Sequence, residues 1–237
     1  MAFACPSIIK VMPLPKQVIE WYRAFGIEHI IPSAALLSDD HTKRRDAHQA
    51  SASPEMGTTL EELQRSVTLI DCHLKKAAKN TVFSDGNPQS QIMFIGEAPG
   101  QEEDAQGKPF VGQSGKLLNE MLRSVGLHRG EVYITNVVFW RPPGNRNPST
   151  EEIQICLPYV RQHISIVKPR IIVLLGGVAI KTLLETTEGV SRLRGSKYQL
   201  MGADVIATFH PSYLLRSPSQ KSLAFQDMIM LKRIIRQ

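Results

Sequence analysis

The chain has 237 residues and a mass of 26.5 kDa, which is enough for one compact domain with an extension. Hydrophobic residues make up 42%, enough for a core, yet no apolar run approaches the roughly 20 residues of a membrane span. The N-terminus lacks the pattern of a signal peptide, so we expect no membrane partner. Three widely spaced cysteines argue against a disulfide scaffold and for a reducing, cytoplasmic location.

Charge is distributed unevenly along the chain. The net charge is +6 and the pI is about 9.3, and residues 192–237 alone hold eight Lys/Arg and two acids. Residues 97–104, in contrast, hold four acids. A basic surface beside an acidic cluster suggests a protein that binds a polyanion and does acid–base chemistry on part of it. Two ordinary solvated faces would give the same pattern, so charge alone leaves both interpretations open.

The N-terminal quarter predicts a helix followed by a linker. Residues 15–31 form an amphipathic pattern with a stop signal at Gly26, so we assign residues 1–32 to a helical extension. Residues 33–57 are rich in Ser, Ala and charge and have no periodicity, which is typical of a flexible linker.

Residues 58–237 alternate predicted helices and strands and form the expected catalytic domain. Thr58 or Thr59 is placed to cap a first helix over residues 60–77. Four apolar runs predict buried strands at residues 91–97, 132–138, 170–177 and 205–210. Helical patterns follow at residues 115–125, 150–166, 178–185 and 223–235. Because the runs are continuous and alternate with helices, we predict an α/β fold: three α/β/α layers around a mainly parallel, four-stranded central sheet.

The segment after the first predicted strand, GEAPGQEEDAQGKPFVG over residues 96–112, has the composition of a binding loop. Its glycines permit close approach of a ligand, its prolines stiffen it, and Phe110 offers a stacking wall. It is not a Walker phosphate loop, because Phe110 and Leu117 stand where that loop needs Gly and Ser/Thr. A surface loop with helix-capping acids is the alternative.

Polar residues lie in or at the end of two further predicted strands. Asn136 interrupts an apolar run, and its amide can read a base edge or brace a loop backbone. His210 ends the fourth strand and precedes a loop, residues 211–218, whose leucines can wedge into a base stack while Arg216 meets phosphate. Ligands bind at the carboxyl ends of parallel strands, so we expect these residues to lie near the 96–112 loop.

Three motifs in this order, GEAPGQEED with GKPFVGQSGKLL, then ITNVVFWRPPGNRNP, then FHPSYLLRSP, resemble the family 4 uracil-DNA glycosylases. The resemblance extends from about Cys72 to the C-terminus and implies the uracil-DNA glycosylase-like fold. It implies a DNA-repair enzyme that flips deoxyuridine out of single- or double-stranded DNA and hydrolyses the N-glycosidic bond, leaving an abasic site without strand cleavage. A monomer is the default expectation.

The resemblance also assigns roles residue by residue. Glu97 would orient or activate the attacking water, and His210 would donate a hydrogen bond to a uracil oxygen. Phe110 would stack on uracil, and Asn136 would bond its edge and reject cytosine. The other expected substrate contacts are Gly96, Ala98, Gly100 and Glu103, and the expected DNA contacts are Ser212, Leu214, Leu215 and Arg216.

The chain departs from the family at the iron–sulfur site, where members commonly use four cysteines. Cys72 and Cys156 match two of these positions, Leu69 stands near the first, and Trp140 replaces the third. Two thiolates cannot hold a cluster that needs about four ligands. We therefore predict no cofactor, with Cys72 and Cys156 as remnants and Trp140 packed into the vacated volume. Zinc on Cys72, His73 and Cys156 is the alternative, although no ligand-spacing signature supports it.

Two other readings compete with a glycosylase. One is a non-catalytic binder of uracil-containing or single-stranded DNA with the same fold, and the other is a polymerase-associated scaffold that docks through residues 1–57. Some relatives trap uracil DNA covalently through a histidine on an inserted basic loop. This chain has no insertion after Gly112 or within RPPGNRNP and it retains Glu97, which favours turnover.

Overall fold

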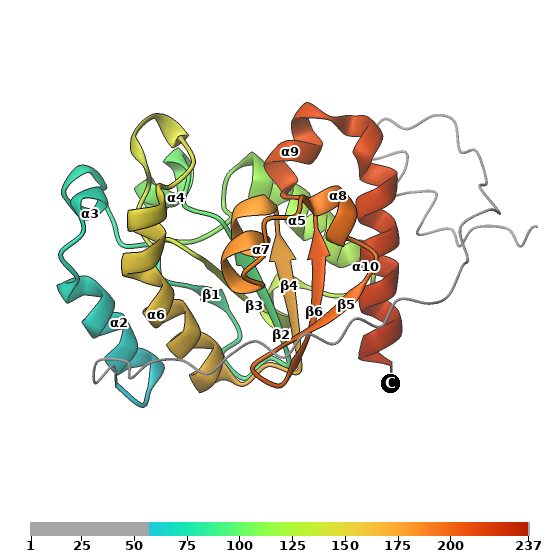
Figure 1. Cartoon of the computed structure of the whole chain (residues 1–237), viewed down its shortest axis with the longest axis horizontal. Coiled ribbons are helices and arrows are strands. Elements are labelled where there is room, and N and C mark those ends of the chain that lie inside the picture. Colours follow the sequence, from blue (N-terminus) through green and yellow to red (C-terminus); the bar gives the residue numbers. More distant parts are fainter. Residues whose placement is uncertain (1–56, 237) are drawn as a thin grey trace, which may run out of the picture. The chain divides into compact units, whose positions relative to one another are not determined.

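The computed structural model describes residues 57–236, in which helices flank a six-stranded sheet (Figure 1). The helix predicted at residues 15–31 and nearly all of the predicted linker lie outside the described residues. The strand order is β1-β3-β2-β4-β6-β5. The four central strands run parallel and match the four predicted ones: β2 (Ile92–Gly96), β3 (Tyr133–Asn136), β4 (Ile171–Leu175) and β6 (Ala203–Thr208).

Two short antiparallel strands at the sheet edges were not predicted, so the expected count of four strands is corrected to six. β1 (Asp85–Gly86) pairs with β3, and β5 (Lys197–Leu200) pairs with β6. A two-residue turn, Met201–Gly202, joins β5 to β6, with φ of 49° and 84°. Two positive φ angles are the geometry that lets a two-residue hairpin follow the twist of its strands.

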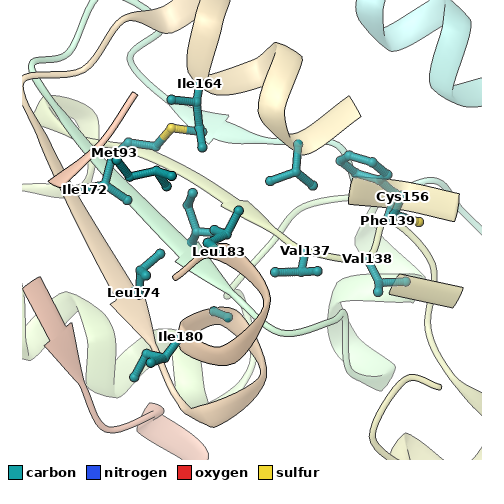
Figure 2. Packing of buried hydrophobic residues seen from close by; sticks show 14 of the residues in the cluster. Met93, Val137, Val138, Phe139, Cys156, Ile164, Ile172, Leu174, Ile180 and Leu183 are labelled. Carbon is teal, nitrogen blue, oxygen red and sulfur yellow. The ribbon is translucent and has the colours of Figure 1, made fainter. Parts of the chain in front are cut away.

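One face of the sheet is covered by α6 (Thr150–Val167) and α7 (Gly177–Leu183), and α2 (Leu60–Leu69) packs on α6. Side chains of a strand alternate between faces, so Met93 and Ile95 of β2 enter this part of the core. Figure 2 shows it from close by, with Met93, Ile172 and Leu174 of the sheet among Ile164, Ile180 and Leu183 of the helices.

The opposite face is covered by α5 (Gln113–Ser124) and α10 (Lys221–Ile235) (Figure 1). All five residues of β2 and of β4 are buried, as expected for parallel strands covered on both faces. The predicted three-layer α/β/α architecture is therefore confirmed. None of the described helices is long and apolar enough to cross a membrane.

The helix predicted at residues 60–77 is interrupted. Thr59 caps α2 in a reciprocal capping box with Glu62, but the helix ends at Leu69. Cys72 is extended, with φ −130° and ψ 131°, and α3 (His73–Ala77) begins after it. The other short helical elements are α4 (Gln101–Gln106), η1 (Arg129–Glu131), η2 (Pro143–Asn145), α8 (Val190–Leu193), α9 (Pro211–Arg216) and η3 (Pro218–Gln220).

The sheet topology creates a crevice at the carboxyl end of β2. From β2 the chain passes to β3 on one side, and from β4 it passes to β5 and then β6 on the other. The chain thus leaves the adjacent strands β2 and β4 toward opposite sides of the sheet. This arrangement leaves an opening beyond their carboxyl ends, where open α/β sheets bind ligands.

Candidate active site

A cavity of about 460 Å³ opens at these strand ends. It brings together nine predicted site residues: Glu97, Ala98, Gly100, Glu103, Phe110, Asn136, His210, Ser212 and Arg216. Glu97 and His210 thus line one cavity although 113 positions of sequence separate them. The wall also contains residues that the sequence analysis did not single out: Pro99, Ser114, Pro142, Asn145, Arg146 and Asn147.

Gly96, the last residue of β2, makes room for two of these side chains. Its neighbour in the sheet register is Asn136. A Cβ at Gly96 would lie 2.4 Å from Asn136 Oδ1 and 2.5 Å from Phe110 Cζ, both far inside contact distance. Gly96 is not itself part of the cavity wall, but its missing side chain lets Phe110 and Asn136 approach each other.

Asn136 presents an unused acceptor. The residue ends β3 and is only 1% exposed, and its Oδ1 has no hydrogen-bond partner in the described part of the chain. Leaving a buried polar atom unpaired costs free energy, so such an atom in a cavity wall points to a ligand. This oxygen braces no loop backbone within the described residues and is available to a ligand.

His210 presents the complementary group, an unused donor. Its Nδ1 accepts from the backbone N–H of Ser212 at 3.1 Å and lies 2.8 Å from the Ser212 hydroxyl. A nitrogen that accepts from a backbone N–H carries no proton, so the neutral ring carries its proton on Nε2. Nε2 is buried and has no partner within residues 57–236, although His210 as a whole is half-buried. Burial, and then the charge of Arg216, lower the pKa of His210 to about 4, so the ring is neutral near pH 7.

Glu97 places a second carboxyl group, besides that of Glu103, in the cavity wall. It follows β2 directly and is half-buried. Burial raises the pKa of its carboxyl group, and the charge of Arg216 partly counteracts this rise. Arg216 therefore acts electrostatically on both Glu97 and His210 from the cavity wall.

Glu103 braces the binding loop. Its carboxylate accepts backbone hydrogen bonds from Gly100 at 3.1 Å, Val111 at 2.9 Å and Gly112 at 2.8 Å. These bonds connect residues on either side of α4, a short helix within the segment predicted to be a loop. Two of the four acids in the cluster thus differ in role, although both line the cavity: Glu103 braces the loop backbone, and Glu97 makes no such backbone contact among the described hydrogen bonds.

Phe110 forms one wall of the cavity. The side chain is 4% exposed, and its ring centroid lies 5.5 Å from that of His210 at an interplanar angle of 34°. Phe110 thus contributes an aromatic ring to the cavity wall, beside the imidazole of His210.

The predicted DNA contacts divide into two groups. Ser212 and Arg216 line the cavity, and Leu215 is 43% exposed. Leu214, however, is fully buried, so the prediction of a DNA-contacting leucine at this position is wrong. The segment forms α9 rather than a loop, and this helix packs on α5, which places Leu214 inside.

The basic C-terminal segment is less available to a polyanion than its composition suggested. Arg194 pairs with the buried Asp227 at 2.8 Å, and Lys197 pairs with Asp204 at 2.7 Å. These cations hold α8 and β5 against the rest of the domain. Among the basic residues of this segment, Arg216 is the one that lines the cavity.

A buried carboxylate anchors the cavity wall that η2 and its flanks form. Glu152 is fully buried and accepts from both terminal nitrogens of Arg146 at 2.8 and 2.5 Å. It also accepts from the Ser149 backbone at 2.7 Å and contacts His73 Nε2 at 2.7 Å. The hydrogen bonds from Arg146 are the largest cause that lowers the pKa of Glu152 to about 2.

The residues at the family's iron–sulfur position do not fit a cluster. Cys72 and Cys156 are free and buried, and Cys156 lies beside Phe139 (Figure 2). Burial is the main cause that raises the pKa of the Cys156 thiol to about 12. Trp140 is 1% exposed and donates to Thr81 Oγ1 at 3.0 Å, so it packs in the core as predicted, whereas Leu69 is 82% exposed.

Metal-binding side chains do not gather at this position. No group of three or more His, Cys, Asp or Glu residues in the described chain has the geometry to hold a metal ion. The zinc alternative would need Cys72, His73 and Cys156 together, but the His73 ring is engaged by Glu152.

Comparison with known proteins agrees with the motifs. A sequence profile of the uracil DNA glycosylase superfamily matches residues 83–231. The type-4 uracil-DNA glycosylase of Pyrobaculum aerophilum is 42% identical over 180 residues, covering 72% of this chain and 92% of the relative. Those of Thermotoga maritima and Archaeoglobus fulgidus are 39% and 41% identical, covering 77% and 68% of this chain and 96% and 85% of the relatives. The chain therefore belongs to the type-4 family of the uracil DNA glycosylase superfamily.

Proposed function

We propose that this protein is a monofunctional uracil-DNA glycosylase, which releases uracil from DNA and leaves an abasic site for base excision repair. The observation that carries the proposal is a single cavity holding a half-buried carboxylate at Glu97, a free acceptor at Asn136 and a free donor at His210. Its family membership supports the same activity.

Asn136 reads the edge of the base. Its Oδ1 accepts from the N3–H of uracil, and its amide nitrogen donates to a carbonyl oxygen. Cytosine presents an acceptor at N3 and a donor at its amino group, so both contacts would be reversed. A buried amide that cannot satisfy its oxygen penalises the wrong base by the cost of the unpaired group.

Phe110 and the glycines around it shape the slot. The Phe110 ring stacks on the base, Gly96 leaves room for ring and amide together, and the backbones of Ala98 and Gly100 contact the base. Glu103 keeps this backbone in place through its three hydrogen bonds rather than by touching the reacting atoms.

Glu97 and His210 act on opposite partners of the bond that breaks. The C1′–N1 bond cleaves with its electron pair going to N1, so the sugar gains oxocarbenium character and the base becomes an anion. The Glu97 carboxylate stabilises the sugar and orients water toward C1′, accepting a proton as the water attacks. The Nε2–H of neutral His210 donates to the anionic base, as a fixed dipole in a site screened from water.

The base reaches these groups only after it leaves the DNA stack. Unstacking costs a few kcal/mol, and a mismatch or single strand lowers that cost. Arg216 meets a phosphate near the flipped nucleotide, Ser212 lies beside it, and Leu215 is exposed and positioned to fill the gap in the stack. The monomeric state and the cytoplasmic location inferred from the sequence stay predictions.

The proposed reaction does not use an iron–sulfur cluster. Only Cys72 and Cys156 remain of the family's four cysteine ligands. The packing of Trp140 and the hydrogen bonds of Glu152 stabilise this part of the fold without a cluster. An iron content near stoichiometric with a broad visible absorbance in purified protein would contradict this proposal.

A uracil-release assay tests the function directly. Oligonucleotides with uracil opposite guanine, opposite adenine and in a single strand are expected to yield alkali-labile abasic sites, and inosine-containing strands serve as controls. The variant Glu97→Ala should release uracil far more slowly while it still binds the oligonucleotide. Binding without release by the wild-type protein would favour the alternative, a non-catalytic binder of uracil-containing or single-stranded DNA.

A further inference from the structure

Phe110 is held in an unfavourable backbone conformation. Its φ is 52°, in the left-handed region that a bulky residue rarely occupies. Such a conformation persists only where the surroundings determine it, and it is common at functional sites. Two contacts, from α5 and from Arg129, hold the Phe110 backbone in place.

One contact comes from α5. A Cβ at Gly115 would lie 1.9 Å from the Phe110 carbonyl oxygen and 2.1 Å from its carbonyl carbon. The helix backbone therefore packs directly against the Phe110 peptide. This close packing limits the position of the peptide from one side.

The other contact is Arg129 of η1, nineteen residues along the chain. Its Nη1 donates to the Phe110 carbonyl at 2.9 Å, and its Nη2 donates to the Pro109 carbonyl at 2.5 Å. Its Nε donates to Asp85 Oδ2 at 2.6 Å. Three nitrogens of one planar guanidinium thus fix two successive carbonyls and a carboxylate, which a point-like ammonium cannot match.

The position of Arg129 suits a structural clamp rather than a DNA contact. Its side chain is 22% exposed, and Asp85, its partner on β1, is 26% exposed. Arg129 is not part of the cavity wall. Its donors are directed at the backbone of the binding loop, so it acts on the cavity through that loop.

We propose that Arg129 is a positioning residue that holds the Pro109–Phe110 peptide so that the Phe110 ring stands in the cavity against His210. The inference rests on the proposed stacking of Phe110 on uracil. Without the guanidinium, the Phe110 backbone relaxes toward negative φ and the ring leaves its stacking position. Arg129 therefore affects uracil release only as far as Phe110 does.

A double-mutant cycle tests this dependence. Single-turnover uracil release is measured for wild type, Arg129→Ala, Phe110→Ala and the double variant, with melting temperatures to verify folding. Phe110→Ala is expected to lower the single-turnover release rate about tenfold or more, the range of one base–aromatic stack. Arg129→Ala should cost a similar factor in the wild-type background and less than about twofold beside Phe110→Ala. Equal losses in both backgrounds would overturn the proposal.

Two further variants separate the clamp from general effects. Arg129→Lys keeps the charge but not the fork, so it should behave like Arg129→Ala, and full activity would contradict the proposal. Arg123→Ala removes an exposed arginine of α5 that pairs with Glu120, and it should leave release unchanged. Arg129→Lys also serves if the alanine variant does not fold.

Hydrogen exchange gives a readout that does not depend on the chemistry. The amides of Val111 and Gly112 donate to Glu103 and lie next to the clamped peptide. They should exchange faster in Arg129→Ala, while the amides of β4 keep their protection. Unchanged exchange at residues 111 and 112 would overturn the proposal. If Phe110→Ala releases uracil at the wild-type rate, the stacking role fails, and the exchange rates alone decide whether Arg129 holds the loop.

Discussion

The folded protein is expected to lose stability steeply in mild acid, and His163 supplies a measurable share of the loss. His163 is fully buried in α6, with its Nε2 3.0 Å from the Tyr133 hydroxyl and its ring 4.3 Å from the Phe83 ring. Its Nδ1 has no partner in the described chain. Burial lowers the pKa of His163 from 6.5 to about 3, so the folded protein keeps this ring neutral where the unfolded chain is protonated.

The magnitude follows from the two pKa values. Because the pKa of His163 is lower in the folded protein than in the unfolded chain, protonation of the unfolded chain reduces the free energy of unfolding as the pH falls from 6.5 toward 3. Above pH 6.5 both states are neutral at His163, and the free energy of unfolding keeps its full value. Between about pH 7 and pH 5 the unfolded state takes up nearly one proton that the folded state does not, which costs about 2 kcal/mol. His210, with a pKa near 4, contributes a second loss of about the same size. Folding free energies are typically about 5–15 kcal/mol, so the two losses together are substantial.

Urea unfolding at pH 7 and at pH 5 measures this loss. The variant His163→Gln cannot titrate, so its free energy of unfolding should fall by about 2 kcal/mol less than that of wild type between the two conditions. The half-buried carboxyl of Glu97 and the buried carboxyl of Asp227 have raised pKa values that act in the opposite direction. Their effects are the same in both proteins and cancel in this comparison. His128→Gln, at an exposed position, is the control for removing a histidine. An identical pH dependence in wild type and His163→Gln would refute the reasoning.

Three further substitutions test the cavity and its support. Gly96→Ala places a methyl group 2.4 Å from Asn136 Oδ1 and 2.5 Å from Phe110 Cζ. The rate of uracil release should therefore fall at least about tenfold, and the free energy of unfolding should fall by roughly 1–3 kcal/mol. Release at the wild-type rate would contradict this prediction. Glu97→Gln should slow uracil release but raise the melting temperature at neutral pH. Burial raises the pKa of the Glu97 carboxyl, which means that the charged form is unfavourable in the folded protein. A lower melting temperature would show instead that the charge stabilises the fold. Glu152→Ala removes a buried carboxylate and should lower the free energy of unfolding in urea by about 2 kcal/mol. This loss is smaller than is usual for breaking a buried ion pair, because Arg146 reaches solvent. An unchanged urea midpoint would show that the pair does not stabilise the cavity wall.

The core strands and most helices could be predicted because their signals are local. Continuous β-branched runs located the four parallel strands, and apolar spacing located α5, α6, α7 and α10 to within a few residues. β1 and β5 gave no such signal, since β1 has two residues and most of β5 is not buried. The break between α2 and α3 was hidden for a related reason, because residues 60–77 keep a helical composition through Cys72.

The candidate site was predictable to the extent that motifs mark the ends of strands. Glu97, Asn136 and His210 each lie at or just beyond the carboxyl end of a parallel strand, so topology brings them to one cavity. Leu214 was misjudged because the HPSYLLRSP segment was interpreted as a loop. On α9, Leu214 packs inward and Leu215 outward, and that difference appears only once the helix and its packing on α5 are known.

Arg129 and Glu152 were missed because their roles depend on contacts that no local pattern encodes. Arg129 reaches carbonyls nineteen and twenty residues away, and Glu152 joins Arg146 to His73 of another helix. The Ser149–Glu152 capping box was the one local signal, and it indicates the start of a helix rather than the support of a cavity wall.

The most direct test compares how Glu97→Ala and His210→Ala alter the single-turnover rate of uracil release under saturating enzyme. With both groups acting on one extruded nucleotide, each substitution should slow release by about 100-fold or more while oligonucleotide affinity changes little. Release within about threefold of wild type for either variant would mean that the two side chains do not act together on one glycosidic bond.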